Sequence, residues 1–283
     1  MPPLHERLTD ARDRFIRAGI SREEATLDAE VLARHVLECD RATFLTRARD
    51  PLPTAFNRLF EALVQRRAAR EPVAYIVGHR EFWGLEFEVT RDVLIPRPET
   101  ELIIEEALAE MPARDAVRHI IDAGTGSGCL AIVLAIEFAP CTVIATDSSD
   151  AALQVAERNA ARYDLSNRVS FRHVDLLDTI DGTADLIVSN PPYLRTDDAA
   201  GLQPEVAQYE PSSALYAGSD GLDVVRRLLI DARNRLAVDG RLIIEFGFEQ
   251  ESGVRDAAAD AGWTVERIRR DLQGIARIVV LRR

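Results

Sequence analysis

The sequence predicts an α/β protein in which a small N-terminal helical bundle and a β-hairpin linker precede a mostly parallel, seven-stranded sheet. Short apolar segments alternate with amphipathic helical segments from about residue 99 onward. Such alternation is typical of a parallel sheet with helices on both faces. The first 75 residues instead repeat apolar side chains at helical spacing. We therefore expect a helical domain at residues 1–75, a hairpin linker at 76–98 and a larger α/β domain at 99–283.

The composition is that of an ordinary globular protein, with 283 residues, 47% of them hydrophobic and 29% charged. No apolar run approaches the roughly 20 residues that a membrane span needs, and the first residues lack the pattern of a secretory signal, so we expect a cytoplasmic protein. The formal net charge of -12 argues against stable binding to nucleic acid, because proteins that bind it usually present excess Lys and Arg. The three cysteines and five histidines lack metal-ligand spacing, so we expect no metal.

The N-terminal segment begins its main helix at a capping box formed by Ser21 and Glu24. There the Ser hydroxyl accepts from the N3 amide and the Glu side chain reaches back to the cap. A further amphipathic helix starts near Phe56 and closes before Pro72. This segment has no catalytic motif and is interpreted as a packing or docking bundle. Apolar residues recur near helical period at Leu27, Val31, Leu32, Val36 and Leu37.

The linker changes character, with strand-like pieces at 75–78 and 81–96 and with Gly78 and Gly84 as turns. Beyond it, strands and helices alternate, and ligands in such sheets bind at the carboxyl ends of the strands. We expect strands at 119–123, 142–146, 169–173, 185–189, 241–246, 263–267 and 277–281. We expect helices at 99–110, from the glycine-rich turn to 136, and at 151–162, 222–236 and 249–261.

A glycine-rich turn follows the first of these strands and opens a helix. Glycine lets the backbone turn tightly and approach a ligand, and the helix N-terminus offers free N–H groups. A G-x-G-x-x-G pattern favours a dinucleotide. Here the glycines fall as G-x-G-x-G after an acid, which resembles the cofactor loop of Rossmann-like, class I S-adenosylmethionine-dependent methyltransferases. The resemblance assigns to cofactor binding Asp122, Gly124, Thr125, Gly126, Ser127 and Gly128.

Two acids end the next two strands. Asp147 is placed to accept from both ribose hydroxyls. Its alternative role is to cap the following helix, which either of the two serines after it could do instead. Asp175 occupies the place of an acid that accepts from the adenine amino group in the resembling enzymes, or it is a turn residue. Leu176 follows where many members carry an aromatic side chain, so we expect apolar packing on adenine without ring stacking.

The sequence Asn190-Pro191-Pro192-Tyr193 ends a further apolar strand and is the strongest catalytic signal. An amide nitrogen is a poor nucleophile, as the rotation barrier of about 18–20 kcal/mol shows. We expect Asn190 Oδ1 and the Pro191 carbonyl each to accept one N–H of a planar –NH2 group. The prolines have fixed φ and no competing N–H, and Tyr193 would stack on the plane. We expect Asn190 to contact the cofactor as well, and all four residues to contact substrate.

The motif itself does not distinguish an amide from the exocyclic amino group of adenine or guanine. Other segments resemble the release factor glutamine methyltransferase (PrmC or HemK) family, and the resemblance covers essentially the whole chain. Its most specific part is the run Leu-Ile-Pro-Arg-Pro-Glu-Thr-Glu at 94–101. Further matching segments lie at 75–78, 81–84, 209–222 and 271–274.

That resemblance implies methylation of the glutamine amide nitrogen (N5) in the Gly-Gly-Gln loop of class 1 peptide chain release factors. S-Adenosylmethionine would be the methyl donor and S-adenosylhomocysteine the product, and the N-terminal helices would help to dock the factor. Pro96 and Arg97 would lie near the site, with Arg97 as a substrate contact or as a structural ion-pair residue. The segment 209–211 is either a loop over the substrate or a turn.

Two alternatives remain open. One is an amino-group methyltransferase that acts on adenine or guanine in RNA or DNA, which the acidic total and the linker resemblance disfavour. The other is a non-catalytic cofactor-binding or chaperone-like protein, which the intact motif at 190–193 disfavours.

Overall fold

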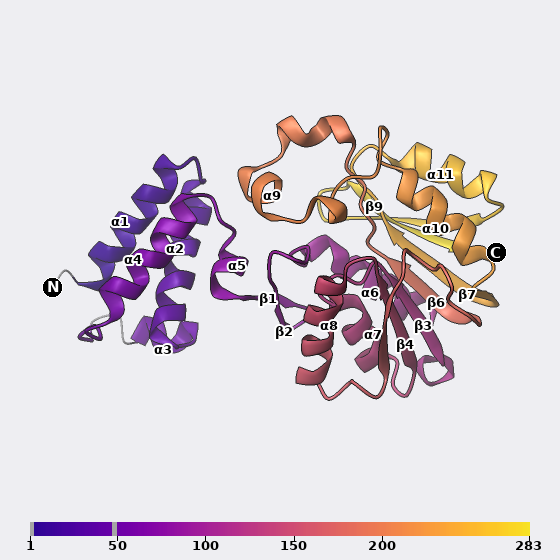
Figure 1. Ribbon diagram of the computed structural model, residues 1–283, viewed down its shortest axis with the longest axis horizontal. Helices are drawn as coiled ribbons and strands as arrows, with labels where there is room; N and C mark the ends of the chain where they lie inside the picture. Colours follow the sequence, from indigo (N-terminus) through magenta and orange to yellow (C-terminus); the bar gives the residue numbers. More distant parts are fainter. Residues whose placement is uncertain (1–2, 47–49) are drawn as a thin grey trace. The chain divides into compact units, whose positions relative to one another are not determined.

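The structure, a computed structural model, describes residues 3–46 and 50–283 and divides into two compact units (Figure 1). Unit 1 is formed by the described part of Met1–Gly78 together with Gln203–Tyr209. Unit 2 is formed by His79–Leu202 and Glu210–Arg283. Nowhere in the described residues is a helix long and apolar enough to cross a membrane.

Unit 1 is helical. Its elements are α1 (Leu4–Arg17), α2 (Arg22–Leu37), α3 (Arg41–Thr46), α4 (Phe56–Ala68), α5 (Val73–Val77) and α9 (Pro204–Tyr209). Ser21 Oγ caps α2 by accepting from the Glu24 amide at 3.2 Å, which confirms the first half of the expected capping box. The Glu24 carboxylate accepts instead from Arg67, so the reciprocal half is absent.

The segment 75–78 is helical, and its prediction as a strand piece was wrong. Pro72 precedes the first turn of α5, and Gly78 ends the helix in the left-handed region at φ 85°. Tyr75 and Ile76 are buried, and Ile76 belongs to the apolar core of unit 1. Packing against the helices therefore decides the conformation of these residues, although their intrinsic preference favours strand.

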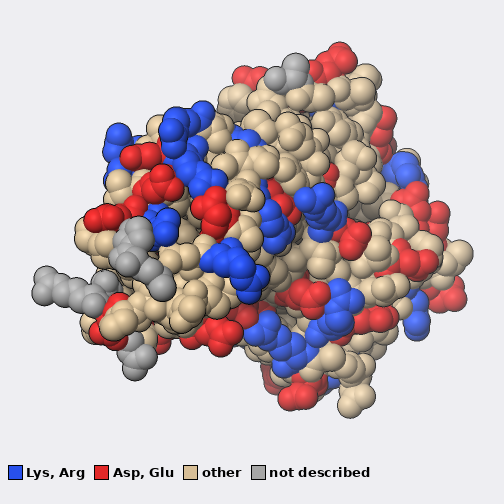
Figure 2. Space-filling view, turned by 60° about the vertical axis from the view of Figure 1, so that its left-hand side comes forward, with Lys and Arg blue, Asp and Glu red and all other residues tan. Residues whose placement is uncertain are grey.

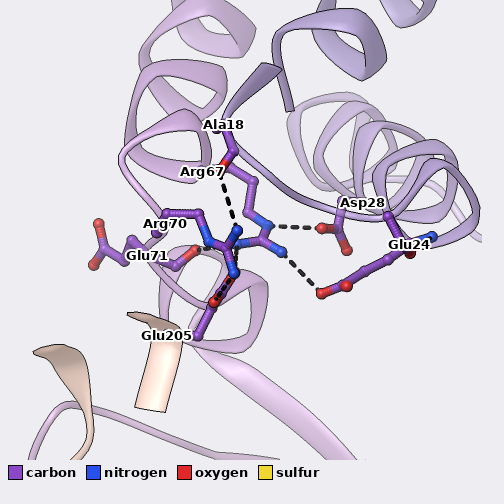
Figure 3. A network of polar contacts seen from close by, with 8 residues as sticks. Ala18, Glu24, Asp28, Arg67, Arg70, Glu71 and Glu205 are labelled. Carbon is purple, nitrogen blue, oxygen red and sulfur yellow. Dashed lines mark hydrogen bonds and ion pairs between the residues drawn. The ribbon is translucent and has the colours of Figure 1, made fainter. Parts of the chain in front are cut away.

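Arg67 is the centre of a buried ionic cluster in unit 1 (Figure 3). Its side chain is 2% exposed, and its Nε donates to Asp28 Oδ2 at 2.6 Å. Nη1 donates to Glu205 Oε1 at 2.6 Å, and Nη2 donates to Glu24 Oε1 at 2.9 Å. Arg70 Nη2 donates to the second oxygen of Glu205. These contacts fix α9 against α2 and α4, although the chain neighbours of the 203–209 segment belong to unit 2.

Unit 2 contains a seven-stranded sheet within its described residues, as predicted. The strand order is β5-β4-β3-β6-β7-β9-β8. Neighbouring strands from β5 to β7 are parallel, and β9 is antiparallel to both β7 and β8. The strands are β3 (His119–Ala123), β4 (Thr142–Asp147), β5 (Val169–His173), β6 (Ala184–Ser189), β7 (Leu236–Glu245), β8 (Thr264–Arg270) and β9 (Ala276–Arg282).

Helices cover both faces of the sheet (Figure 1). One face packs against α6 (Glu101–Glu110), α7 (Cys129–Glu137) and α8 (Asp150–Arg162), and the other against α10 (Asp223–Arg233) and α11 (Glu251–Asp260). Successive strand residues point to opposite faces, so Ile120 and Ile121 enter different cores. Short 3-10 helices are η1 (Pro98–Thr100), η2 (Arg114–Ala116), η3 (Thr196–Gly201) and η4 (Ser212–Ala214).

Two further predictions on element bounds were wrong. The helix predicted at 222–236 ends at Arg233, and Leu236 begins β7. Leu236 fits the helical spacing, but it pairs with Ala184 of β6 and is fully buried in the sheet core. The strand pieces predicted at 81–96 form the hairpin of β1 (His79–Phe82) and β2 (Leu85–Glu88) only as far as Glu88, and residues 89–96 are not a strand.

The hairpin is anchored to α8 by polar contacts. Asn159 Oδ1 accepts from the Glu88 amide at 2.7 Å, and its Nδ2 donates to the Glu88 carbonyl at 3.0 Å. The same Nδ2 donates to the Ser127 carbonyl at 2.8 Å. Asn159 thus joins the hairpin to the glycine-rich turn, which it helps to hold in place.

Candidate active site

A pocket in unit 2 lies at the carboxyl ends of the parallel strands. In the sheet order, β3 has β4 on one side and β6 on the other, so the loops after these strands diverge and leave room for a ligand. Many of the described residues that line the pocket come from the turn after β3, the end of β4, the loop after β5 and the end of β6, and others come from the segments 92–100 and 211–214. Of the predicted site residues, the lining includes Gly124, Thr125, Gly126, Ser127, Asp147, Asp175, Leu176, Asn190 and Pro192.

The glycine-rich turn needs glycine for two different reasons. Gly124 and Gly126 have φ values of 74° and 55°, and an added Cβ would meet nothing within 4 Å. Their requirement is therefore backbone conformation, and they border open space in the pocket. Gly128 also has a positive φ, 81°, but a Cβ there would lie 3.0 Å from Ala156 Cβ. Gly128 therefore allows the start of α7 to approach α8 closely.

Asp122 lies under this turn and is fully buried. Its Oδ2 accepts from Thr125 Oγ1 at 2.6 Å and from the Ala131 amide at 3.1 Å. Its Oδ1 is buried without a partner among the described residues. Burial raises the pKa of Asp122 to about 7, against the opposing hydrogen bonds. A nearby cation would favour the ionised carboxylate. Asp122 is not among the described residues that line the pocket, so its expected contact with the cofactor stays a prediction.

Asp147 ends β4 with both carboxylate oxygens engaged by backbone. Oδ2 accepts from the Gly126 amide and Oδ1 from the Ser149 amide, each at 2.9 Å. Burial raises the pKa of Asp147, while these hydrogen bonds lower it. Ser149 Oγ caps α8 by accepting from the Ala152 amide at 3.2 Å, so the cap does not depend on the acid. Asp147 thus lines the pocket without serving as the helix cap.

Asp175 and Leu176 form the wall after β5. The Asp175 carboxylate is half-exposed and pairs with Arg227 Nη2 at 2.7 Å. The adenine contact expected of Asp175 stays a prediction. Leu176 is buried with φ 50°, and its carbonyl accepts from Thr146 Oγ1 at 2.7 Å. Its side chain supplies apolar surface at the place where an aromatic residue is common in the resembling enzymes.

Asn190 lies at the end of β6 with its side-chain amide held from one side. Nδ2 donates to Thr100 Oγ1 at 2.9 Å, and the Thr100 hydroxyl donates to Glu245 Oε2 at 2.7 Å. Asn190 Oδ1 is buried and has no partner among the described residues. An unpartnered buried acceptor is costly, so this oxygen is suited to an incoming N–H donor. Tyr193 Oη donates to Glu245 Oε1 at 3.5 Å.

The turn after β6 is held by Gln250. Its Nε2 donates to the Tyr193 carbonyl at 2.9 Å, and its Oε1 accepts from the Gly247 amide at 2.8 Å. Gly221 packs against the same turn so closely that an added Cβ would lie 2.3 Å from the Tyr193 carbonyl oxygen. Pro191 is buried and Pro192 is half-buried. The backbone of the turn is therefore fixed from outside the motif.

Arg97 forms an ion pair within unit 2, where its Nη2 donates to Glu210 Oε1 at 2.5 Å. The Glu210 side chain is 1% exposed and its Oε2 is buried without a partner in the described residues. Burial raises the pKa of Glu210, which Arg97 opposes. Arg97 thus forms a structural ion pair, and its expected contact with substrate stays a prediction. Pro96 and Pro211, the neighbours of this pair in the sequence, line the pocket.

Three residues that hold the turn at 190–193 were not assigned to the site from the sequence: Thr100, Glu245 and Gln250. Glu245 had a usable signal, because it is a lone charge in the apolar run Leu-Ile-Ile-Glu-Phe. Thr100 lies in the 94–101 run, which indicated the family but assigned this residue no role. Gln250 had no signal, since polar residues are common where a helix begins.

Known families and proteins match nearly the whole chain. The family described as PrmC N-terminal domain matches residues 6–78, and the methyltransferase small domain family matches residues 100–206. A release factor glutamine methyltransferase of Cereibacter sphaeroides is 43% identical over 275 residues, 97% of this chain and 96% of that protein. Another, from Xylella fastidiosa strain 9a5c, is 40% identical over 281 residues, 99% of this chain and 98% of that protein.

Solved structures share the fold at lower identity. The N-terminal domain of human METTL16 in complex with SAH has a TM-score of 0.51 and 18% identity, covering 79% of this chain and 83% of that one. A T. thermophilus 16S rRNA methyltransferase (RsmC) in complex with AdoMet and guanosine has a TM-score of 0.52 and 17% identity, covering 72% of this chain and 50% of that one. At such identities the likeness supports the architecture of the sheet and its helices alone.

Proposed function

The chain belongs to the release factor glutamine methyltransferase family, and we propose that it methylates the side-chain amide nitrogen, N5, of the glutamine in the Gly-Gly-Gln motif of class 1 peptide chain release factors. This reaction would support translation termination. The observation that carries the proposal is Asn190 Oδ1, a buried acceptor that no donor among the described residues engages, at a pocket beside the carboxyl ends of the parallel strands.

The residues present fit S-adenosylmethionine, the methyl donor of this enzyme class. Beneath the turn, Asp122 Oδ1 is a buried acceptor with no partner in the described part of the chain, and Gly124 and Gly126 leave open space beside the backbone. Asp147 lines the pocket, where it would accept from ribose hydroxyls, and Leu176 would offer an apolar wall to the base. When bound, S-adenosylmethionine supplies a methyl group on a positively charged sulfur, which leaves with its electron pair as the nitrogen attacks.

The residues of the turn at 190–193 would orient and polarise the substrate amide. Asn190 Oδ1 and the Pro191 carbonyl each accept one N–H, which aims the nitrogen and stabilises the positive charge that develops on it. Positioning of this kind supplies up to about 7–11 kcal/mol in well-oriented systems. Pro192 and the ring of Tyr193 contact the planar group. The nitrogen loses its proton late, to water, and no covalent enzyme intermediate is needed.

Unit 1 would dock the release factor. Every described residue that lines the pocket belongs to unit 2, so we assign the chemistry to unit 2 and the docking to unit 1. The described side chains on the face in Figure 2 mix acidic and basic groups without forming a continuous basic surface. With a net charge of -12, this mixture favours a protein partner over stable binding to nucleic acid.

Mass spectrometry of a release factor incubated with the enzyme and S-adenosylmethionine tests the proposal. We expect one added methyl group, on the glutamine of the Gly-Gly-Gln motif, and none in a parallel reaction with Asn190→Ala enzyme. Transfer of labelled methyl to RNA or DNA, with none to the release factor, would instead establish the amino-group methyltransferase as the function.

A further inference from the structure

A chain of hydrogen bonds connects Asn190 to a buried carboxylate on another strand. Asn190 at the end of β6 contacts Thr100 of η1 at 2.9 Å, and Thr100 contacts Glu245 at the end of β7 at 2.7 Å. Thr100 is 3% exposed and Glu245 is 2% exposed. All three residues belong to unit 2. Thr100 is among the described residues that line the pocket and Glu245 is not, so only the Glu245 end of the chain is sheltered from water and from substrate.

The direction of each hydrogen bond follows from the charge at the inner end. An ionised carboxylate can only accept, so the single hydroxyl hydrogen of Thr100 must point to Glu245. Thr100 Oγ1 then has only lone pairs to offer to Asn190. The Asn190 amide must therefore present Nδ2 to Thr100 and leave Oδ1 for the substrate. If the Asn190 amide were rotated so that Oδ1 and Nδ2 changed places, Nδ2 would aim its N–H donors at the substrate nitrogen and repel the hydrogens of the –NH2 group.

We propose that Thr100 and Glu245 are positioning residues, which fix the amide of Asn190 so that its oxygen receives the substrate –NH2 group. This inference rests on the proposed function, whose acceptor is Asn190 Oδ1. Neither residue touches the substrate in this account. They act through Asn190 by removing the alternative orientation, in which the same side chain would face the substrate with the wrong polarity.

The second oxygen of Glu245 serves the other end of the motif. Tyr193 Oη donates to Glu245 Oε1 at 3.5 Å, while Thr100 occupies Oε2. Burial raises the pKa of Tyr193, so its hydroxyl keeps its hydrogen and remains a donor. One carboxylate therefore orients both polar side chains of the turn, which explains a charged residue at a fully covered position of the sheet.

The hydrogen-bonded chain of Asn190, Thr100 and Glu245, here called the relay, should respond to the protonation of Glu245. Burial raises its pKa to about 7, with Arg277 and Arg97 lowering the pKa and Glu99 raising it. Thr100 and Tyr193 are the uncharged groups that contact it. A protonated Glu245 can donate to Thr100, which would free the Thr100 hydrogen to point to Asn190. Turnover should therefore rise as the pH increases through about 7.

The test compares full-length variants on a release factor at saturating S-adenosylmethionine. Thr100→Val removes the hydroxyl at nearly constant volume, Thr100→Ser restores it, and Glu245→Gln removes the charge but keeps the shape. Glu106→Gln is the matched control, because Glu106 is a buried carboxylate of unit 2 that pairs with Arg267 at 2.9 Å outside the pocket. The measurements are kcat, KM, the pH profile of kcat, the affinity for S-adenosylhomocysteine and the unfolding midpoint.

We expect Thr100→Val to lower kcat about 100-fold, the size of effect that misplacement of a catalytic group produces. Its KM and its affinity for S-adenosylhomocysteine should change little, and the rise of kcat near pH 7 should disappear. Thr100→Ser should recover most of the activity. Glu245→Gln should lower kcat about 10-fold, because Gln can either accept from or donate to Thr100. Glu106→Gln should match the wild type.

An unchanged kcat and pH profile in Thr100→Val, with the wild type active on the release factor, would overturn the relay alone. The Thr100 variants decide this even if Glu245→Gln fails to fold. A wild-type enzyme that methylates no release factor would instead overturn the proposed function, and this inference with it.

Discussion

Removal of the Glu205 carboxylate should release α9 from the other helices of unit 1. Glu205 contacts both Arg67 and Arg70, and its side chain is 11% exposed. Loss of one partner from a buried ion pair costs about 3–5 kcal/mol. Arg67 keeps Asp28 and Glu24, so we expect the lower end for Glu205→Ala, about 3 kcal/mol. At about 1.4 kcal/mol per factor of ten, the opening equilibrium of α9 should increase roughly 100-fold.

Amide hydrogen exchange measures this opening directly. The amides of Val206 and Ala207 both donate to the Gln203 carbonyl at 3.0 Å, and they are protected only while this segment keeps its fold. We expect both amides to exchange about 100-fold faster in Glu205→Ala, because the substitution lowers the free energy of opening by about 3 kcal/mol.

An exposed ion pair of the same unit provides the control. Arg14 contacts Glu61 at 2.9 Å, but the Glu61 side chain is 45% exposed. Pairs of this kind contribute up to about 1 kcal/mol, so Glu61→Ala should leave exchange in α9 unchanged. Equal exchange at Val206 and Ala207 in the wild type and Glu205→Ala would refute the role assigned to the buried cluster.

Three further predictions concern the pocket. Gly128→Ala should lower the unfolding free energy in chemical denaturation more than Gly182→Ala does. Both glycines have a positive φ, but only at Gly128 would an added Cβ lie 3.0 Å from a neighbouring atom, Ala156 Cβ. Equal losses would exclude the packing argument. Asp122 has its folded pKa raised from 3.8 to about 7, so the folded state keeps a proton that the unfolded state loses between these values. The free energy of unfolding should therefore fall as the pH rises through this window. Asp122→Asn should show a smaller fall in pH-dependent denaturation and should bind S-adenosylmethionine more weakly. An unchanged slope of the unfolding free energy against pH would contradict the raised pKa assigned to Asp122. Asp147→Ala should weaken S-adenosylhomocysteine binding by about 10- to 100-fold in calorimetry, through the lost ribose contact and the unpaired Gly126 amide, whereas wild-type affinity would exclude the ribose role.

The centre of the sheet was predictable because strands such as β3 and β6 are short apolar segments with their own boundaries, whereas the edge strand β8 is mostly polar. Residues such as Ile120 and Ile121 are buried on opposite faces, so the whole segment is apolar and stands out from the amphipathic helices. At Leu236, apolar spacing alone predicts the wrong element. Its spacing continues the stripe of α10, and only its pairing with Ala184 of β6 assigns it to a strand.

The position of the 203–209 segment could not be predicted from local sequence. Glu205 is an acid in a short segment without a clear apolar period, where solvent exposure is the ordinary expectation. It is buried because Arg67 and Arg70 lie beside it, and these partners are more than a hundred residues away in the chain. Long-range charge pairing of this kind leaves no periodic pattern that a reader of the sequence could use.

In the candidate site, too, local motifs were predictable from the sequence and long-range contacts were not. The glycine-rich turn and the Asn190-Pro191-Pro192-Tyr193 turn are local motifs, since consecutive residues carry both the backbone geometry and the polar groups. The contact between Thr100 and Glu245 spans 145 residues and exists only because the fold brings η1 to the end of β7. Sequence therefore indicated the acceptor on Asn190, while the structure was needed to show what orients it.

The most direct test is a crystal structure of the enzyme with S-adenosylhomocysteine and a peptide that contains Gly-Gly-Gln. We predict that the glutamine amide nitrogen lies at hydrogen-bond distance, about 2.7–3.2 Å, from both Asn190 Oδ1 and the Pro191 carbonyl oxygen. Asn190 Nδ2 should remain on Thr100 in that complex. A glutamine bound elsewhere, or an Asn190 amide that presents Nδ2 to it, would contradict the account.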